Sequence, residues 1–217
     1  MPANPAGGGG LPDLTLAAAD GSWSRVLVPL DGPRDAITLG WREATVPATA
    51  AAGDALLLLP DGRELARWTL DVPPRLDDSP EFALAVGESL GTLARLAGYT
   101  LADTSAGTTD PLEVTLVWQA GAGAAQGRYT VFVHLLNDQG QIIAQSDSIT
   151  ARGARPTSGW RAGEYILDRH ELRFNALAQP GSARLIVGMY DARSGERVAQ
   201  WPGNADHIAL PGEVKPR

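Results

Sequence analysis

The chain has 217 residues and carries 18 Lys and Arg against 25 Asp and Glu, which gives a net charge of −7. This acidic balance argues against nucleic acid or an anionic lipid surface as the main partner, and the absence of cysteine excludes disulfides, thiolate nucleophiles and Cys-based zinc sites. No apolar run reaches the length of a membrane-spanning helix, and the first residues lack the basic and apolar regions of an export signal, so we expect no direct membrane insertion.

Strand signals dominate the chain after a Gly- and Pro-rich lead-in over residues 1–12. Short apolar or alternating runs recur between Gly, Pro, Asp and Asn at intervals of about ten residues, which is typical of a β-sandwich. The predicted strands are 14–18, 25–30, 36–41, 55–59, 64–71, 92–101, 113–119, 129–137, 141–147, 165–174, 183–191, 197–201 and 207–210. Leu90, Leu93 and Leu96 also fit helical spacing, but 92–101 alternates acceptably, so we predict a strand after a short turn.

Parts of the sequence resemble one another. The segments ending at Trp41 and Trp118 are each followed by a small-residue stretch and an apolar strand that leads to a Gly turn, and residues 182–201 form a shorter third echo. Such similarity marks a recurring supersecondary unit, here a β-hairpin. We therefore predict an all-β fold, an antiparallel β-sandwich of the jelly-roll or immunoglobulin-like kind with an internally repeated hairpin unit.

The proline-rich segment 72–80 cannot be a central strand or a helix, because its prolines lack the backbone donor and fix φ. It is the best candidate for a seam between two β units. We predict a partial β repeat over residues 13–86 and a complete sandwich over residues 87–213, packed against the first. Strand 129–137 is apolar on both faces, so it is predicted to be central and covered on both sides.

Residues 87–208 resemble a C-terminal module of large bacterial multi-spanning glycosyltransferase-like proteins that use lipid-linked sugars. The blocks that carry the resemblance are LAGYTL (96–101), LEVTLVWQA (112–120), YTVFVHLLNDQGQIIAQSD (129–147), PTSGWRAGEYILD (156–168) and LIVGMYDARSGERV (185–198). The resemblance implies an extracytoplasmic location and a membrane-embedded glycosyltransferase portion as a partner. It does not carry over the transferase activity, because that activity would reside in the membrane portion.

The PTSGWRAGEYILD segment has the densest cluster of candidate binding residues. Trp160 could stack on a sugar ring while Arg161, Glu164 and Asp168 bond its hydroxyls. In the structural alternative, Trp160 plugs the end of the sandwich and Glu164 pairs with a neighbouring Arg.

Four of the remaining tryptophans recur at similar places in the repeat, which favours a packing role. Trp41 and Trp118 each close an alternating strand, and Trp68 and Trp201 each lie near the end of a strand that follows a turn. Large aromatic residues in β-sandwiches mostly serve the core, so we predict that these four are buried.

Patterns for catalysis or metal binding are weak. Asp147, Glu164 and Asp168 could form a glycosidase pair or a calcium site, but no regular acidic loop is present. A zinc site would need His134, His170 and His207 to converge, and His134 is predicted to be a core histidine bonded to a backbone carbonyl. Ser89 lies in a G-x-S-x-G match that lacks the strand-turn-helix context of a nucleophile.

These patterns predict no catalytic residue, metal or cofactor. The predicted function is a non-catalytic accessory module that binds glycan or cell-envelope carbohydrate beside a membrane glycosyltransferase, with no nucleic-acid partner. The alternative is a structural or protein-interaction β-sandwich. Exposed Trp or Tyr along a groove would favour the first function, and buried Trp throughout would favour the second.

Overall fold

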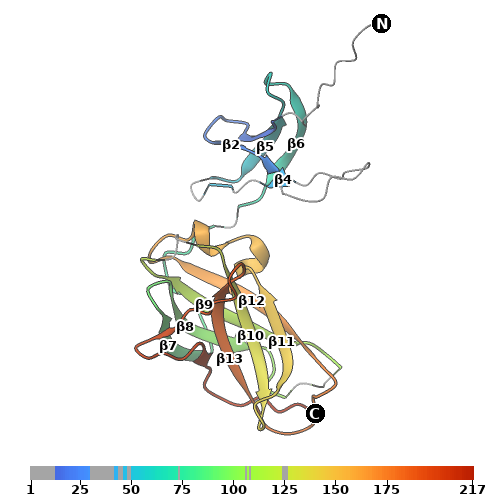
Figure 1. The fold of residues 1–217 in the computed structure, drawn as a ribbon, viewed down its shortest axis with the longest axis vertical. Coiled ribbons are helices and arrows are strands. Elements are labelled where there is room, and N and C mark those ends of the chain that lie inside the picture. The colour runs from blue at the N-terminus through green and yellow to red at the C-terminus, as the bar shows by residue number, and fades with distance from the viewer. Residues whose placement is uncertain are drawn as a thin grey trace, which may run out of the picture. The chain divides into compact units, whose positions relative to one another are not determined.

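A computed structural model describes residues 13–29, 42–43, 46–47, 50–72, 74–105, 107, 109–123 and 127–217 (Figure 1). The protein is all-β with antiparallel sheets, 48% strand and 4% helical. It divides into two compact units, Met1–Pro73 and Pro74–Arg217. The division falls inside the proline-rich segment 72–80. The predicted boundary after residue 86 lies within a strand of the second unit, which pairs with the next strand along the chain.

The first unit contains a four-stranded antiparallel sheet with the order β2-β1-β5-β6 and a separate pair, β3-β4. Its strands are β1 (Thr15–Ala18), β2 (Ser24–Val26), β3 (Val28–Pro29), β4 (Arg42–Glu43), β5 (Gly53–Leu58) and β6 (Glu64–Leu70). Among the described residues, its core consists of Leu16, Trp23 and Ala55 with partly buried neighbours. The predicted strand 36–41, including Trp41, lies outside the described residues.

The second unit contains a nine-stranded, nearly barrel-shaped sheet with the order β14-β7-β8-β9-β12-β11-β10-β13-β15. Its strands are β7 (Leu84–Leu90), β8 (Ala94–Leu101), β9 (Leu112–Ala120), β10 (Tyr129–Asn137), β11 (Ile142–Ser148), β12 (Tyr165–Phe174), β13 (Ala183–Asp191), β14 (Gln200–Trp201) and β15 (Ile208–Ala209). The connection between β11 and β12 contains two 3₁₀ turns, η2 (Thr150–Gly153) and η3 (Thr157–Gly159).

Alternation along the strands builds one core in this unit. On β9, Leu112, Val114, Leu116 and Trp118 are buried, whereas the residues between them lean to the other side, as the two-residue period of a strand requires. Matching residues from β8, β10, β12 and β13 join the same cluster. The core therefore draws on strands from both halves of the sheet.

Strand β10 confirms the prediction that it is central. It pairs with β11 on one side and with β13 on the other, and the run from Val131 to Leu135 is buried on both faces. By contrast, β11 and β12 share only the register pairs Ala144↔Phe174 and Gln145↔Arg173. Beyond those pairs the two strands separate, and side chains must fill the opening.

The segment with ambiguous periodicity is a β-hairpin. Strands β7 and β8 pair on either side of a tight turn in which the Leu93 N–H donates to the Leu90 carbonyl. Gly91 adopts φ +50, a conformation that favours glycine. The predicted strand at 92–101 is therefore confirmed, and β7 was missed. In the described part of the chain no helix is long and apolar enough to cross a membrane.

Candidate functional site

The connection between β11 and β12, where the sequence predicts a sugar platform, is folded into the body of the second unit. Trp160 is 3% exposed and belongs to the core cluster. Its indole N–H donates to the Arg155 carbonyl oxygen over 2.8 Å. A sugar ring stacks on an aromatic face that is open to solvent. Trp160 offers no such face, so its predicted role as a sugar platform is corrected and the ring is assigned to the core.

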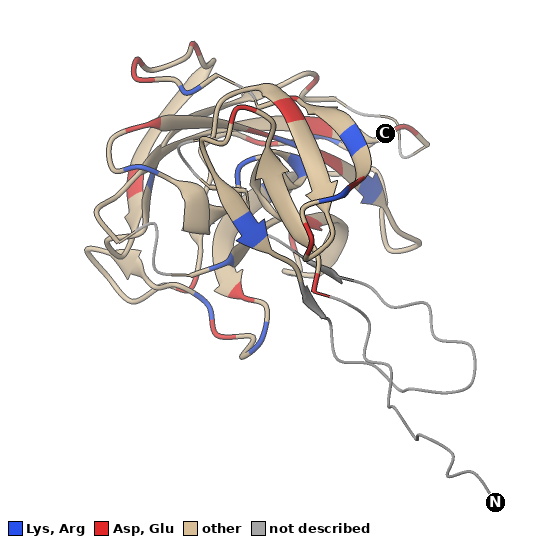
Figure 2. Cartoon of the chain, turned by 90° about the horizontal axis from the view of Figure 1, so that it is seen from above, with Lys and Arg blue, Asp and Glu red and all other residues tan. Residues whose placement is uncertain are grey.

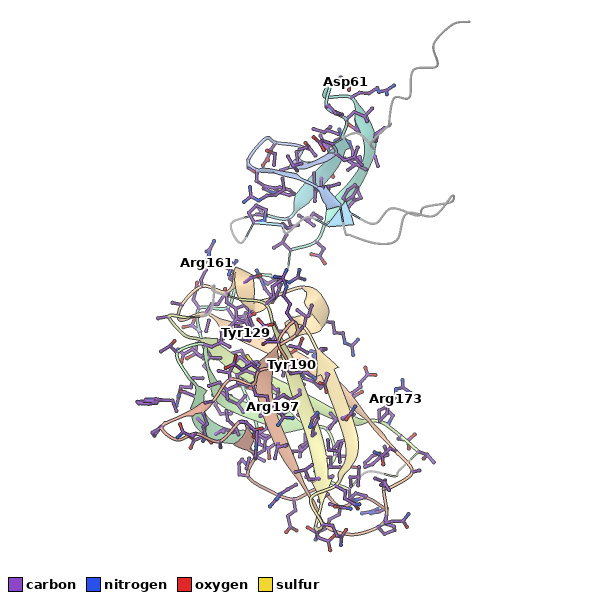
Figure 3. All side chains as sticks on the ribbon, viewed as in Figure 1. Asp61, Tyr129, Arg161, Arg173, Tyr190 and Arg197 are labelled. Carbon is purple, nitrogen blue, oxygen red and sulfur yellow. The ribbon has the colours of Figure 1, made fainter. Side chains whose placement is uncertain are left out.

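Glu164 is a buried carboxylate held by the start of the second unit. Its Oε2 pairs with the Arg75 guanidinium, and its Oε1 accepts the backbone N–H of Arg161 over 2.9 Å. Arg75 also donates to the Gly159 carbonyl over 3.2 Å. The side chain of Arg161 is exposed and lies at this end of the unit (Figure 3). Glu164 therefore fastens the connection instead of facing a ligand.

Several guanidinium groups surround this one carboxylate. Burial lowers the pKa of Arg155, and the nearby charges of Arg75 and Arg161 lower it further, while Glu164 opposes the shift. In this corner several guanidinium groups lie around one carboxylate, and the Arg75–Glu164 pair ties the proline-rich segment to the β11–β12 connection.

Asp168, the fourth predicted site residue, belongs to a different network. Its Oδ1 accepts the backbone N–H of Ala151 over 2.8 Å, and its Oδ2 is 3.0 Å from His170 Nε2. His170 Nδ1 lies 3.1 Å from the Ser146 hydroxyl oxygen. The side chains of Asp168 and His170 are both 0% exposed. A carboxylate can only accept, so the Nε2–H of His170 donates to Asp168.

This Ser146–His170–Asp168 chain contains the residue types of a hydrolase triad, but its location explains it as structure. It fills the opening where β11 and β12 separate. It also holds η2, in which Ala151 and Arg152 adopt φ +52 and +53, a strained conformation for residues with a side chain. The sequence signal was available, because Asp168 and His170 are two apart on a strand and so share a face.

The predicted acids and histidines do not form a metal centre. Asp147 pairs with His134, Asp168 with His170, and Glu164 with Arg75. Among the residues that the structure describes, no group of three or more His, Asp or Glu side chains is arranged to hold a metal ion.

A second cluster lies on β10, β11 and β13 and is centred on Phe132. The His134 ring lies 4.8 Å from the Phe132 ring, centroid to centroid, and the Tyr190 ring lies 6.3 Å away. The Arg197 guanidinium lies 4.3 Å above the Phe132 ring, an attractive cation–π geometry. Figure 3 labels Tyr190 and Arg197 in this part of the unit. Gly188 makes room for Phe132, because a Cβ there would come within 2.4 Å of its ring.

His134 is buried, as the sequence predicts, but its partner is a carboxylate and not a backbone carbonyl. Its Nε2 lies 3.3 Å from Asp147 Oδ1. Burial holds the pKa of His134 below the usual 6.5, although Asp147 favours the charged form and Arg197 disfavours it. His134 is therefore neutral in the folded protein under conditions where an unfolded chain would begin to protonate it.

We expect the His134→Gln variant to lose part of the pH dependence of stability. Between the folded pKa and 6.5, the unfolded state binds a proton that the folded state does not, so stability is complete above 6.5 and falls as the pH drops through the folded value. Urea unfolding between about pH 5 and pH 8 should show this loss in the original chain and a flatter curve in the variant. Identical curves would contradict the assignment.

The solvent side of β14, β7, β8, β9 and β12 carries a row of side chains in direct cross-strand register. We call these residues the cross-strand row: Trp201, Ser89, Arg95, Gln119 and Tyr165. Adjacent strands lie about 4.8 Å apart, so the row spans roughly 19 Å. It has an aromatic ring at each end and a cation at its centre.

Exposure marks this row as available for contact. Trp201 is 69% exposed, Arg95 is exposed, and Ser89, Gln119 and Tyr165 are partly exposed. The sequence predicts that Trp201 and Trp68 are buried, and both predictions are wrong. Trp68, in the first unit, is 42% exposed. The prediction for Trp118 is confirmed, since its side chain is fully buried.

Charge elsewhere on the surface is mixed. Figure 2 shows acidic and basic residues interspersed over the described strands and loops. Arg95 makes no ion pair with the described residues, and its Nε donates to the Gly87 carbonyl over 3.2 Å. Its charge is therefore fixed in place but not neutralised by a carboxylate of the described chain.

Comparisons with known proteins give little to set beside these observations. No family model matches the chain, and no curated protein matches it. Among the solved structures, it is similar to the alkylpurine DNA glycosylase AlkC of Pseudomonas fluorescens, bound to DNA containing an abasic site analogue. The TM-score is 0.29 at 11% identity, and the match covers 58% of this chain and 31% of the glycosylase chain.

This match corrects two predictions. The similar protein is an enzyme bound to DNA, so we no longer exclude enzymatic activity or a nucleic-acid partner for this chain, and we do not retain the predicted glycan and glycosyltransferase partners. A TM-score this low assigns neither enzymatic activity nor DNA binding to this chain.

Proposed function

We propose that the second unit is a protein-interaction module that contacts its partner through the cross-strand row. The observation that carries this proposal is the exposure of Trp201, which leaves most of a large apolar side chain in water. Burying a Trp ring against a partner is strongly favourable, and the side chains that dominate protein interfaces are most often Trp, Tyr and Arg. The row contains one of each.

The fold holds Trp201 in place without covering it. Its neighbour Gln200 donates from its side chain to Glu88 over 2.9 Å and from its backbone to the Ala205 carbonyl over 2.7 Å. The Gly91 N–H donates to the Ala199 carbonyl over 2.8 Å. Because the backbone around Trp201 is already held by these hydrogen bonds, binding a partner would cost this chain little backbone conformational entropy.

The chemistry of the row also indicates what the partner presents. Arg95 lies between the two aromatic ends and is not paired with an acid of the described chain. A carboxylate opposite Arg95 would form a charge-assisted hydrogen bond. The partner that fits best is a protein segment with an acidic residue flanked by apolar side chains.

We also propose that the second unit is a sandwich and that its hairpins repeat. We infer that the nine-stranded sheet divides where β11 and β12 separate, into a layer β14-β7-β8-β9-β12 and a layer β11-β10-β13-β15. The support is a core cluster that contains inward residues of both layers, as expected of an immunoglobulin-like sandwich. The turns of the hairpins β5-β6 and β10-β11 are similar, with Gly62 and Gly140 at φ +82 and +75, which supports a repeated hairpin.

The family resemblance of residues 87–208 and the extracytoplasmic location that rests on it stay predictions.

Selection of a phage-displayed peptide library against the full chain tests the proposed function. We expect the enriched peptides to carry an acidic residue between apolar ones, and we expect Trp201→Ala to weaken their binding by at least about 30-fold, as for an interface hot spot of about 2 kcal/mol. Trp68→Ala removes an exposed ring of the same type from the other unit and should leave binding unchanged.

A charge exchange adds a second test at the centre of the row. Arg95→Glu should weaken binding of the acidic peptides, and a peptide with Lys in place of its acid should recover part of that loss. Equal binding of the selected peptides to the original chain and to a folded Trp201→Ala variant would overturn the proposal.

A further inference from the structure

A hollow of about 450 Å³ lies at the other end of β12 from Tyr165, between the β10–β11 turn and the β12–β13 connection. This volume is within the range of ordinary ligand sites. One wall is formed by residues 137–139 and 141, the other by residues 176, 177 and 179–182, and Ile143 also lines the hollow. None of these residues belongs to the cross-strand row.

Both walls are fixed by hydrogen bonds to asparagine side chains. Asn137 Oδ1 accepts the N–H groups of Gln139 and Gln141 over 3.1 and 2.9 Å. Asn175 Nδ2 donates to the Ile142 carbonyl over 2.8 Å, and its Oδ1 accepts the Leu177 N–H over 2.8 Å. Asn175 thereby ties the second wall to β11. These hydrogen bonds hold both walls of the hollow in position.

The polar lining is rich in carboxamides. Gln139 and Gln179 line the hollow, and their side chains make no hydrogen bond with the other described residues. Each carboxamide offers both a donor and an acceptor, which is the pattern that a peptide backbone presents. Gln141 adds a third amide, whose Oε1 accepts from Asn137 over 3.0 Å and whose N–H₂ group is left to donate.

The apolar lining is aliphatic, and one charge completes it. Ile143, Leu177 and Pro180 surround the hollow without an aromatic ring on which a sugar or base could stack. Leu177 is 51% exposed. Among the described residues that line the hollow, Asp138 is the one with a charged side chain. These groups suit an aliphatic side chain next to a cationic one.

From this lining we propose that the hollow binds a short extended peptide segment in which an aliphatic residue is next to Lys or Arg. The aliphatic side chain lies on Leu177 and Ile143, the backbone amides bond to the carboxamides of Gln139 and Gln179, and the cation faces Asp138. This site is independent of the cross-strand row, and its test does not depend on the proposed function.

The test is an NMR titration of the full chain with the peptide Ac-Lys-Leu-Ala-NH₂. We expect saturable shifts of the Gln139 and Gln179 side-chain amides and of the Leu177 N–H, with a dissociation constant on the order of millimolar, as so few contacts allow. Ac-Lys-Gly-Ala-NH₂ and Ac-Glu-Leu-Ala-NH₂ should each bind more weakly, because one lacks the aliphatic side chain and the other reverses the charge.

Matched variants separate a site from general surface contact. Leu177→Ser should weaken binding by about tenfold, the loss expected for one aliphatic contact, whereas Leu65→Ser, at a similarly exposed position in the first unit, should not. Asp138→Asn should remove the preference for the Lys peptide over the Glu peptide. The proposal is overturned if no saturable shift occurs up to about 20 mM peptide, a concentration well above the expected dissociation constant. It is also overturned if Leu177→Ser and Leu65→Ser change the peptide affinity equally.

Discussion

Trp118→Ala is expected to lower the free energy of unfolding of the second unit by about 3 to 5 kcal/mol, the usual cost of removing a large buried aromatic side chain. Trp118 is fully buried on β9, and its inward neighbours Leu96 on β8 and Ile166 on β12 are in direct register with it. Their packing leaves the vacated space little room to collapse. Urea unfolding followed by far-ultraviolet circular dichroism measures the change.

Trp118→Phe provides the matched control. The indole Nε1 of Trp118 is buried and has no hydrogen-bond partner among the described residues, so the N–H group contributes a desolvation cost and no bond. Replacing indole by a phenyl ring removes that cost and keeps most of the apolar volume. We expect a much smaller loss than for Ala. Equal losses in the two variants would show that the N–H group is satisfied and important.

Asp168→Ala is expected to lower the free energy of unfolding by about 3 kcal/mol. The substitution leaves two donors without a partner, the buried His170 Nε2–H and the partly buried Ala151 N–H, and an unsatisfied buried donor costs about 1 to 3 kcal/mol. It also releases the strained residues of η2, so the β11–β12 connection should become more accessible to proteases.

Arg169→Ala is the control, because Arg169 is the next residue along β12 and is exposed on the opposite side. Its loss should stay within about 0.5 kcal/mol, as for other surface positions. An Asp168→Ala loss no greater than that of Arg169→Ala would mean that the buried chain does not stabilise the fold.

The strands of the second unit could be predicted well because their pattern reports burial directly. The run from Val131 to Leu135 has apolar residues on both faces, and the structure places β10 between two partners. Strand β7 was missed because Gly87 and Glu88 interrupt its alternation, at a point where the register with β8 shifts. A bulge of this kind is visible only once the partner strand is known.

The sites were harder to predict, because exposure depends on partners that are distant in sequence. Trp160 is buried and Trp201 is exposed, although both follow loops rich in small residues. Trp201 belongs to a strand that pairs with β7, more than one hundred residues earlier, and its neighbour sequence contains no sign of that pairing. Direct register across β14, β7, β8, β9 and β12 is likewise a property of the sheet and not of any one segment.

The nine-stranded sheet ends on two very short strands, β14 and β15, of two residues each. Long unpaired edges are templates on which further chains add as strands, and short edges deny them that template. At these two ends of the sheet, the second unit should therefore resist the addition of further strands at high concentration. The same geometry leaves an incoming chain few backbone groups to pair with beside Trp201, so recognition at that edge depends on side chains.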